Sequence, residues 1–297
     1  MIYHRVDELI GETPILELEH IGQSTIYVKL EMFNIGGSVK DRIALQMIDD
    51  MEAQGIIKRD SKLVEATSGN TGIGLAMVCA SRGISLTIIM PENMSKERQD
   101  IMKAYGAKII LSEAKSGMKG AEILAEELAK QGYIYLNQFE NQSNVKAHFE
   151  HTSKEIMAEF PKGIDYLVAG VGTSGTITGL SKALKVKFPK IKMIAVEPFE
   201  SAILSGEVKG PHGIQGIGAG FVPPLYNKDY VDRVIKITTA DAKQCVKDLA
   251  RKGLLLGISS GAAITASRAI AKENKNAKIL CISADGGIKY LSTGTYE

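Results

Sequence analysis

Lys40 is the residue in this chain whose type and position best suit chemistry. Asn34 to Ser38 has the Gly and Ser content of a loop, and the apolar residues after Asp41 recur at helical spacing. Partial desolvation at the first turn of a helix makes a lysine amine a better nucleophile toward an aldehyde. Lys40 is therefore a candidate to hold an aldehyde cofactor as a Schiff base. A solvated cation at the start of a helix would give the same local pattern.

A second candidate is a loop that follows the apolar run 62–66 and precedes the apolar segment 73–80. Hydroxyl groups, an amide and backbone N–H groups gather there at a predicted helix N-terminus, which is a natural anion site. The carboxylate of an amino acid would fit it, and an ordinary helix cap is the alternative. The candidate ligands in this loop are Thr67, Ser68, Gly69, Asn70 and Thr71.

A glycine-rich segment from Gly170 to Thr176 also lies between a predicted strand and a predicted helix. Three of its glycines spell GxGxxG, and Glu197 follows after the next strand, as in a dinucleotide-binding fold. The same backbone amides would equally hold one phosphate monoester, assisted by the hydroxyl groups of the segment. This motif alone leaves both hypotheses open. The monoester hypothesis uses Gly172, Thr173, Ser174, Gly175 and Thr176.

Two further polar residues stand at predicted strand ends or helix starts. Ser260, in Gly257 to Ala262, would cap a helix or hydrogen-bond a heterocyclic nitrogen. A neutral serine would not keep a pyridine protonated, which favours elimination of a β-substituent over deeper carbanion chemistry. Gln138 follows a predicted strand, where ligands bind in parallel sheets, and would donate to a carboxylate. A solvated amide is the alternative for Gln138.

The composition is that of an ordinary soluble protein. The chain has 297 residues, 44% hydrophobic and 24% charged, with a net charge of +2 that favours neither nucleic acid nor a membrane surface. The apolar runs are too short to span a bilayer, and the N-terminal residues lack the apolar core of a signal peptide. The histidines and cysteines show no metal spacing. Three dispersed cysteines predict buried, reduced thiols and a cytoplasmic location.

Short apolar runs alternate with segments of helical period along the chain. This alternation predicts an α/β fold whose mostly parallel sheets are covered on both faces. Gly206 to Pro224, rich in Gly and Pro, is expected to be an ordered functional loop. Strands are predicted at 26–30, 62–66, 85–90, 107–111, 133–136, 166–169, 192–196 and 278–282, and helices at 41–54, 95–105, 120–130 and 144–160.

Taken together, these segments resemble the cysteine synthase (O-acetylserine sulfhydrylase) family of fold-type II pyridoxal 5'-phosphate (PLP) enzymes, which is related to cystathionine β-synthase. The resemblance runs nearly end to end, and the joint order of its motifs is highly specific. It rests on residues 10–14, 29–31, 34–42, 67–74, 90–92 with 94–95, 138–144 with 147–148, 172–176, 213–221 and 257–262.

The resemblance implies a role for each candidate residue. Lys40 would be the Schiff-base lysine and proton shuttle, and Asn70 would contact the 3′-oxygen of PLP. Ser260 would face the pyridine nitrogen. The phosphate would be held by Gly172, Thr173, Gly175 and Thr176, with Ser174 where the family usually has glycine. The substrate carboxylate would be held by the loop that contains Thr67, Ser68, Gly69 and Thr71, together with Gln138.

The resemblance also implies an architecture and a reaction. The fold would comprise two doubly wound, mostly parallel-sheet domains similar to the tryptophan synthase β subunit. Residues 41–141 would form a smaller mobile domain, and 1–40 with 142–297 the larger, PLP-phosphate-binding one. The enzyme would be a homodimer and a possible partner of serine acetyltransferase. It would form L-cysteine from O-acetyl-L-serine and sulfide by β-replacement through an α-aminoacrylate.

Several positions depart from the usual family pattern without removing a predicted catalytic group. They include Ile35, Gln142 and Gly213, which fall in predicted loops and entrance segments. The alternatives are a relative that uses serine or cysteine, forming cystathionine or releasing sulfide. A more distant alternative is a dinucleotide-dependent oxidoreductase, which would leave Lys40 and the loop at Thr67 unexplained.

Overall fold

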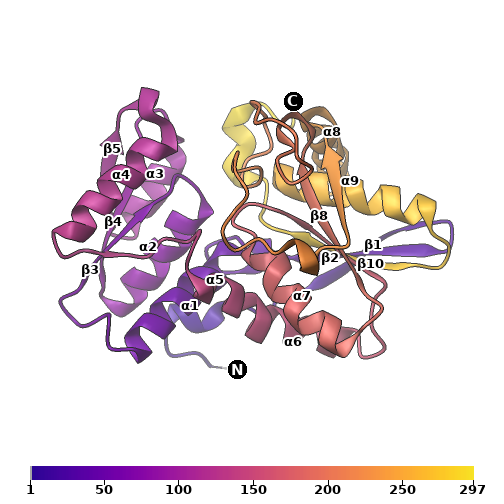
Figure 1. Ribbon diagram of the computed structural model, residues 1–297, viewed down its shortest axis with the longest axis horizontal. Coiled ribbons are helices and arrows are strands. Elements are labelled where there is room, and N and C mark those ends of the chain that lie inside the picture. The colour runs from indigo at the N-terminus through magenta and orange to yellow at the C-terminus, as the bar shows by residue number, and fades with distance from the viewer. Residues whose placement is uncertain (1) are drawn as a thin grey trace. The chain divides into compact units, whose positions relative to one another are not determined.

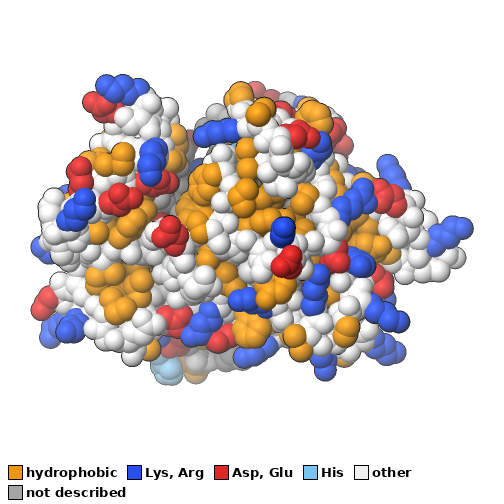
Figure 2. Space-filling model, in the orientation of Figure 1, with side chains coloured by type: hydrophobic (Ala, Val, Ile, Leu, Met, Phe, Trp, Pro, Cys, Tyr) orange, Lys and Arg blue, Asp and Glu red, His pale blue; other side chains and the backbone are white. Residues whose placement is uncertain are grey.

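The computed structural model describes residues 2–297 and divides into two compact units (Figure 1). Unit 1 takes in the N-terminal residues up to Ile10 and Asn34–Asn144, and unit 2 takes in Gly11–Phe33 and Val145–Glu297. None of the helices that the structure describes is long and apolar enough to cross a membrane. On the face shown in Figure 2, basic and acidic side chains are interspersed.

Unit 2 is built on a six-stranded sheet with the strand order β1-β2-β10-β7-β8-β9. Strands β1 and β2 pair antiparallel, and all the other pairs in this sheet are parallel. The carboxyl ends of β7 and β10 therefore lie side by side at the same end of the strands. The strands are β1 (Ile15–Ile21), β2 (Ser24–Leu30), β7 (Tyr166–Gly170), β8 (Lys192–Pro198), β9 (Arg233–Ile237) and β10 (Lys278–Ser283).

Alternate residues of these strands supply two separate cores. Val168 and Ile194 belong to one core together with residues of helices α8 (Thr239–Ala250) and α9 (Ile258–Glu273). Leu167 and Met193 belong to the other, with residues of α6 (Ser153–Glu159) and α7 (Gly175–Lys187). Since side chains of a strand alternate between faces, the two cores cover both sides of the sheet. This arrangement explains the nearly continuous apolar runs.

Unit 1 contains a four-stranded, wholly parallel sheet with the order β5-β4-β3-β6. Helix α4 packs on β3 and β4 through Ala121 and Ala125, and α1 packs on α2. The elements are α1 (Lys40–Ala53), β3 (Lys62–Ala66), α2 (Asn70–Arg82), β4 (Ser85–Pro91), α3 (Lys96–Ala104), β5 (Lys108–Ser112), α4 (Gly117–Lys130) and β6 (Ile134–Tyr135), and the last residues of unit 1 begin helix α5 (Gln142–Ala147), whose residues from Val145 onward belong to unit 2.

Asp7 explains why the N-terminal segment belongs to unit 1. This buried carboxylate accepts hydrogen bonds from Nε and Nη2 of Arg82, at 2.9 and 2.7 Å, and from Ser81 Oγ at 2.9 Å. The hydrogen bonds from arginine lower the pKa of Asp7 against the opposing effect of burial. The segment is thus held at the C-terminal end of α2 by charge-assisted hydrogen bonds.

The predicted α/β class with parallel sheets is confirmed, and the ends of the predicted strands lie within two residues of the observed ends. Strands β1 and β9 had not been predicted. The expected helix 144–160 is wrong as a single element, because a π-helical turn at His148–Thr152 separates α5 from α6. Gly206 to Pro224 forms no helix or strand, as expected.

The three cysteines are buried and carry free thiols, as predicted. Burial raises the pKa of Cys79 to about 12 and also raises the pKa values of Cys245 and Cys281. All three thiols are therefore protonated at neutral pH and poor nucleophiles.

Candidate active site

Lys40 is the first residue of α1 and is half-buried. Its backbone N–H donates to Ser38 Oγ at 3.2 Å, and Asp41 Oδ2 accepts from the Gly36 N–H at 2.7 Å. A Cβ atom at Gly74 of α2 would lie only 3.2 Å from the Lys40 carbonyl oxygen. The glycine at this position therefore allows α1 and α2 to approach closely, which fixes the backbone that carries Lys40.

The loop from Thr67 to Gly69 connects the end of β3 to the start of α2. The Gly69 N–H donates to Thr67 Oγ1 at 3.3 Å, which tightens the turn. Because the N-cap residue is Gly69, no N-cap side chain satisfies the first N–H groups of α2. Ser68 and Asn70 are half-buried beside them. The structure thus places the predicted carboxylate loop at an uncapped helix N-terminus, which favours an anion.

Thr71 and Gln138, 67 residues apart in the sequence, are brought together in unit 1. Thr71 Oγ1 donates to Gln138 Oε1 at 2.7 Å, and both side chains are buried. Asn144 Nδ2 donates a hydrogen bond to the backbone carbonyl oxygen of Gln138 at 2.9 Å. Two of the residues expected at the substrate carboxylate therefore form one buried polar pair.

Glu65 is a polar residue at this site that the sequence analysis missed. It lies on β3 two residues before Thr67, is 1% exposed, and accepts a hydrogen bond from the Gln138 backbone N–H at 3.3 Å. Burial raises the pKa of Glu65 to about 8. The available signal was a single carboxylate within the otherwise apolar run Leu63 to Ala66.

The predicted phosphate loop connects β7 to α7 in unit 2. Ser174 has a φ of 74°, in the left-handed region, and its side chain makes no capping hydrogen bond to the helix as far as the described residues go. A Cβ atom at Gly172 would overlap the Gly216 carbonyl oxygen. The loop is therefore pressed against the segment that contains Gly216, with the N–H groups of the first turn of α7 at its end.

The hydroxyl groups of this loop are partly engaged within unit 2. Ser174 Oγ lies 3.2 Å from Thr178 Oγ1, and Thr176 Oγ1 lies 3.1 Å from His148 Nε2. His148 begins the π-helical turn and also contacts Thr152 through Nδ1 at 3.0 Å. The unexpected π-helical turn thus supplies a contact to the phosphate loop.

Ser260 lies in the first turn of α9 and is fully buried. Ser283 Oγ, at the end of β10, donates to Ser260 Oγ at 3.0 Å. Because β10 and β7 are parallel neighbours, Ser260, which contacts the end of β10, lies at the same carboxyl ends of the strands as the phosphate loop. The structure therefore brings Ser260 and the loop together in unit 2, whereas Lys40, Asn70 and the carboxylate loop belong to unit 1.

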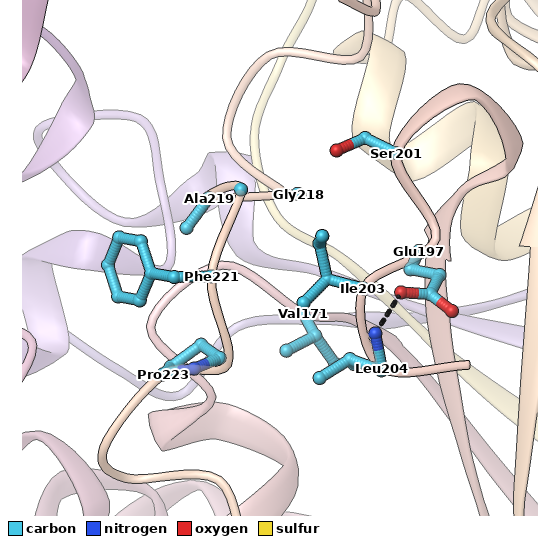
Figure 3. Close-up of a pocket in the computed structure, with 10 residues that line it drawn as sticks. Val171, Glu197, Ser201, Ile203, Leu204, Gly218, Ala219, Phe221 and Pro223 are labelled. Atoms are coloured by element: carbon cyan, nitrogen blue, oxygen red, sulfur yellow. Dashed lines mark hydrogen bonds between the residues drawn. The ribbon is translucent and has the colours of Figure 1, made fainter. Parts of the chain in front are cut away.

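Glu197 is the residue that a dinucleotide site would need, but its carboxylate already accepts hydrogen bonds from nearby groups of the protein. Its carboxylate accepts from the backbone N–H groups of Leu204 at 2.7 Å and Ser205 at 3.0 Å, and from Ser205 Oγ at 2.6 Å. Figure 3 shows the first of these bonds at the wall of a pocket. Part of the loop at Gly218 and Phe221 lines this pocket, which has about 230 Å³ of space, some of it open to solvent. Glu197 therefore acts as a buried structural acceptor.

Each unit combines a mostly parallel sheet with a loop that leads from a strand into the N-terminus of a helix, a position that favours an anion. The family "pyridoxal-phosphate dependent enzyme" matches residues 6–285, and the chain belongs to it. PLP is accordingly its cofactor. Among the described residues no group of three or more His, Cys, Asp or Glu side chains is arranged to hold a metal ion.

Within this family the chain is similar to cysteine synthases. It is 45% identical to a cysteine synthase of Staphylococcus aureus, with 98% of this chain and 96% of that protein aligned. A crystal structure of a cysteine synthase from Entamoeba histolytica superposes with a TM-score of 0.97 and 45% identity, covering 100% of this chain and 91% of that one. A hydrogen sulfide-producing enzyme from Fusobacterium nucleatum superposes with a TM-score of 0.93 and 43% identity, covering 97% and 100%.

Proposed function

We propose that this chain is a PLP-dependent cysteine synthase, which forms L-cysteine from O-acetyl-L-serine and sulfide by β-replacement. The observation that carries the proposal is the Thr71–Gln138 pair at the uncapped start of α2, in the same unit as Lys40. An amino-acid carboxylate needs such a cluster of donors, and the relatives that share this fold nearly end to end include cysteine synthases.

The residues present fit PLP group by group. The phosphate would lie at the start of α7 among Gly172, Thr173, Ser174, Gly175 and Thr176, where a side chain at Gly172 would clash. Lys40 would bind the cofactor aldehyde, and Asn70 would hydrogen-bond the 3′-oxygen. Ser260 would hydrogen-bond the ring nitrogen without charging it. When bound, the cofactor supplies the electron sink that stabilises negative charge at the substrate α-carbon.

The residues of this chain then bind the substrate and move its protons. The carboxylate is held by the backbone and side chains of Thr67, Ser68, Gly69 and Thr71, and by the Gln138 amide. Once the substrate amine has displaced Lys40 from the cofactor aldehyde, the freed Lys40 amine removes the α-proton as a general base, and the acetate group leaves from the β-carbon. After sulfide has added at the β-carbon, Lys40 returns the proton to the α-carbon. One lysine thus serves as cofactor anchor, base and acid.

We extend the proposal to organisation and partners. Residues 41–141 would move as a smaller domain that closes over bound substrate and excludes water. The enzyme would be a cytoplasmic homodimer and a possible partner of serine acetyltransferase. Size-exclusion chromatography with light scattering tests the dimer, and co-elution with serine acetyltransferase tests the partner.

The test of the proposed function is a visible absorption spectrum during a titration with O-acetyl-L-serine in the absence of sulfide. The cofactor band should shift on addition of this donor and return when sulfide is added, with release of L-cysteine. L-Serine and L-cysteine, titrated in parallel, are the matched controls. A band that ignores O-acetyl-L-serine and shifts with one of these controls would overturn the assignment of the donor.

A further inference from the structure

Glu65 is a buried carboxyl group that the mechanism above does not use. It lies in the interior of β3, in register with Ile88 of β4, and is 1% exposed. Its neighbours Val64 and Ala66 pack in an apolar core against α4, so the Glu65 side chain, which alternates with them along the strand, points to the other face of the sheet. Burying a carboxyl group in the interior of a sheet is costly, so an apolar residue at this position would stabilise the fold more unless the carboxyl group has a function.

The contacts of Glu65 all lead to the segment that carries Gln138. The Gln138 backbone N–H donates to Glu65 Oε1 at 3.3 Å, whereas Oε2 has no hydrogen-bond partner within residues 2–297. Asn137 adopts a φ of 47°, a left-handed conformation that is uncommon for a non-glycine residue. The backbone N–H of Asn137 and the Gln138 side chain also act on the Glu65 carboxyl group by hydrogen bonding.

The Gln138 side-chain amide has two possible orientations, and only one of them serves a carboxylate ligand. In the structure the amide oxygen faces Thr71, whose hydroxyl donates to it at 2.7 Å. A carboxylate accepts hydrogen bonds and cannot donate them. The substrate carboxylate is proposed to bind beside Thr71, so the amide must turn its N–H2 group, rather than its oxygen, toward Thr71. The amide oxygen then turns away from Thr71 and needs another donor in this buried place.

We propose that Glu65 is the positioning residue that supplies this donor: while protonated, its Oε2–H group donates to the Gln138 amide oxygen and so directs the amide N–H2 group to the substrate carboxylate. An ionised Glu65 has only acceptor atoms and would hold the N–H2 group for itself. The inference rests on the proposed role of Gln138 and deepens it. It makes substrate binding depend on one buried proton.

The surroundings of Glu65 support the protonated form at neutral pH. Burial is the largest influence and raises the pKa of Glu65 to about 8, against the hydrogen bonds from residues 137 and 138. Glu122 of α4 raises it further by charge repulsion. Tyr135 of β6, whose own pKa is raised by burial and by Glu65, stays neutral in this range. From β4 the residue in register is the apolar Ile88. The proton is therefore lost as the pH rises through about 8.

The test compares wild type with Glu65→Gln, which is isosteric and cannot ionise. KM for O-acetyl-L-serine and kcat are measured at saturating sulfide from pH 6.5 to 9.5. Between pH 7 and 9.5, KM of the wild type should rise more than KM of the variant, by a factor on the order of tenfold for one proton. The ratio of the two KM values cancels the ionisations of the substrate itself. The ratio of kcat values should stay constant, since only binding is affected.

Two outcomes would overturn the inference while leaving the proposed function intact. One is a wild-type enzyme that forms L-cysteine with a KM ratio that does not change with pH. The other comes from Gln138→Leu, which removes the amide while Glu65 is still present and can be used even if Glu65→Gln does not fold. The ratio of the wild-type KM to the KM of Gln138→Leu should rise with pH, and a ratio that stays constant would rule out the route through Gln138. Failure of the proposed function appears separately, as a wild type without turnover at any pH.

Discussion

The two units each place a helix N-terminus after a parallel strand, yet they prepare it differently. In unit 2 the loop before α7 contains a left-handed Ser174 and a glycine pressed against the Gly216 carbonyl. In unit 1 the loop before α2 ends in Gly69, where an added Cβ would meet no heavy atom of the described residues within 4 Å. The first loop is closely packed and the second is open.

This difference matches the two anions proposed for the sites. A phosphate that stays through every turnover benefits from a rigid loop, because no conformational freedom has to be lost on binding. A substrate carboxylate must enter and leave, and the polar groups that would hold it, Thr71 and Gln138, satisfy each other meanwhile. The same helix-dipole physics therefore serves a resident ligand in one unit and an exchanging ligand in the other.

The largest effect on activity is expected from a substitution outside both loops, at Lys40. Lys40→Ala should lower kcat by at least about 10³-fold, because the base, the acid and the cofactor anchor are lost together. Steady-state assays of L-cysteine formation measure the change. Lys58→Ala, at an exposed lysine, is the control and should retain activity. A Lys40→Ala enzyme with the wild-type kcat would refute the assignment.

The contrast between a packed and an open loop predicts unequal responses to the same substitution. Gly172→Ala should weaken PLP binding by about 10- to 100-fold, since the new methyl group overlaps the Gly216 carbonyl and displaces the loop. Gly69→Ala, the matched control in unit 1, should leave PLP affinity within about threefold. Titration of the cofactor-free protein with PLP compares the two. Equal effects of both substitutions would contradict the distinction.

Loss of one donor in unit 1 should affect substrate rather than cofactor. Thr71→Val keeps the shape of the side chain and removes the hydroxyl group that donates a hydrogen bond to Gln138. KM for O-acetyl-L-serine should rise about tenfold, as expected for a lost hydrogen bond to a charged ligand. The PLP dissociation constant of the same variant serves as the internal control. A change in PLP affinity with an unchanged KM would reverse the proposed division of labour.

The last prediction concerns stability. The pKa of Glu65 is raised from 4.5 to about 8, so the folded state keeps a proton that the unfolded chain loses. The stabilisation is complete below pH 4.5 and disappears as the pH rises to about 8, by a few kcal/mol at most. Glu65→Gln should flatten this dependence. Hydrogen exchange of the β3 amides from pH 5 to 8, corrected for intrinsic rates, measures it, and parallel profiles for both proteins would count against the raised pKa.

Most of the fold could be predicted because the interior strands are short, apolar and separated by helical patterns. The two missed strands, β1 and β9, are the edges of the unit 2 sheet. Many of their residues are exposed or only partly buried, although Ile235 and Ile237 of β9 are buried, so charged side chains interrupt the apolar runs. The π-helical turn was also missed, because its one extra residue per turn leaves helical periodicity nearly unchanged over a short segment.

For the candidate site, the sequence sufficed where residue type and local geometry act together. Lys40, the carboxylate loop and the phosphate loop all stand where a strand or loop leads into a helix, and the structure places them there. The pairing of Thr71 with Gln138 and the contact of Glu65 with Gln138 depend on neighbouring strands β3 and β6. Such contacts join distant parts of the chain, and no local pattern encodes them.

The burial of Cys79, Cys245 and Cys281 has a practical consequence. The native protein should react only slowly with maleimides and iodoacetamides, so its own thiols should not need to be removed before labelling. One cysteine introduced on the surface of each unit, at exposed Lys58 and exposed Val186 for example, could carry a fluorescent donor and acceptor. Energy transfer between the dyes would then report, molecule by molecule and during turnover, whether the distance between the two units changes when substrate arrives.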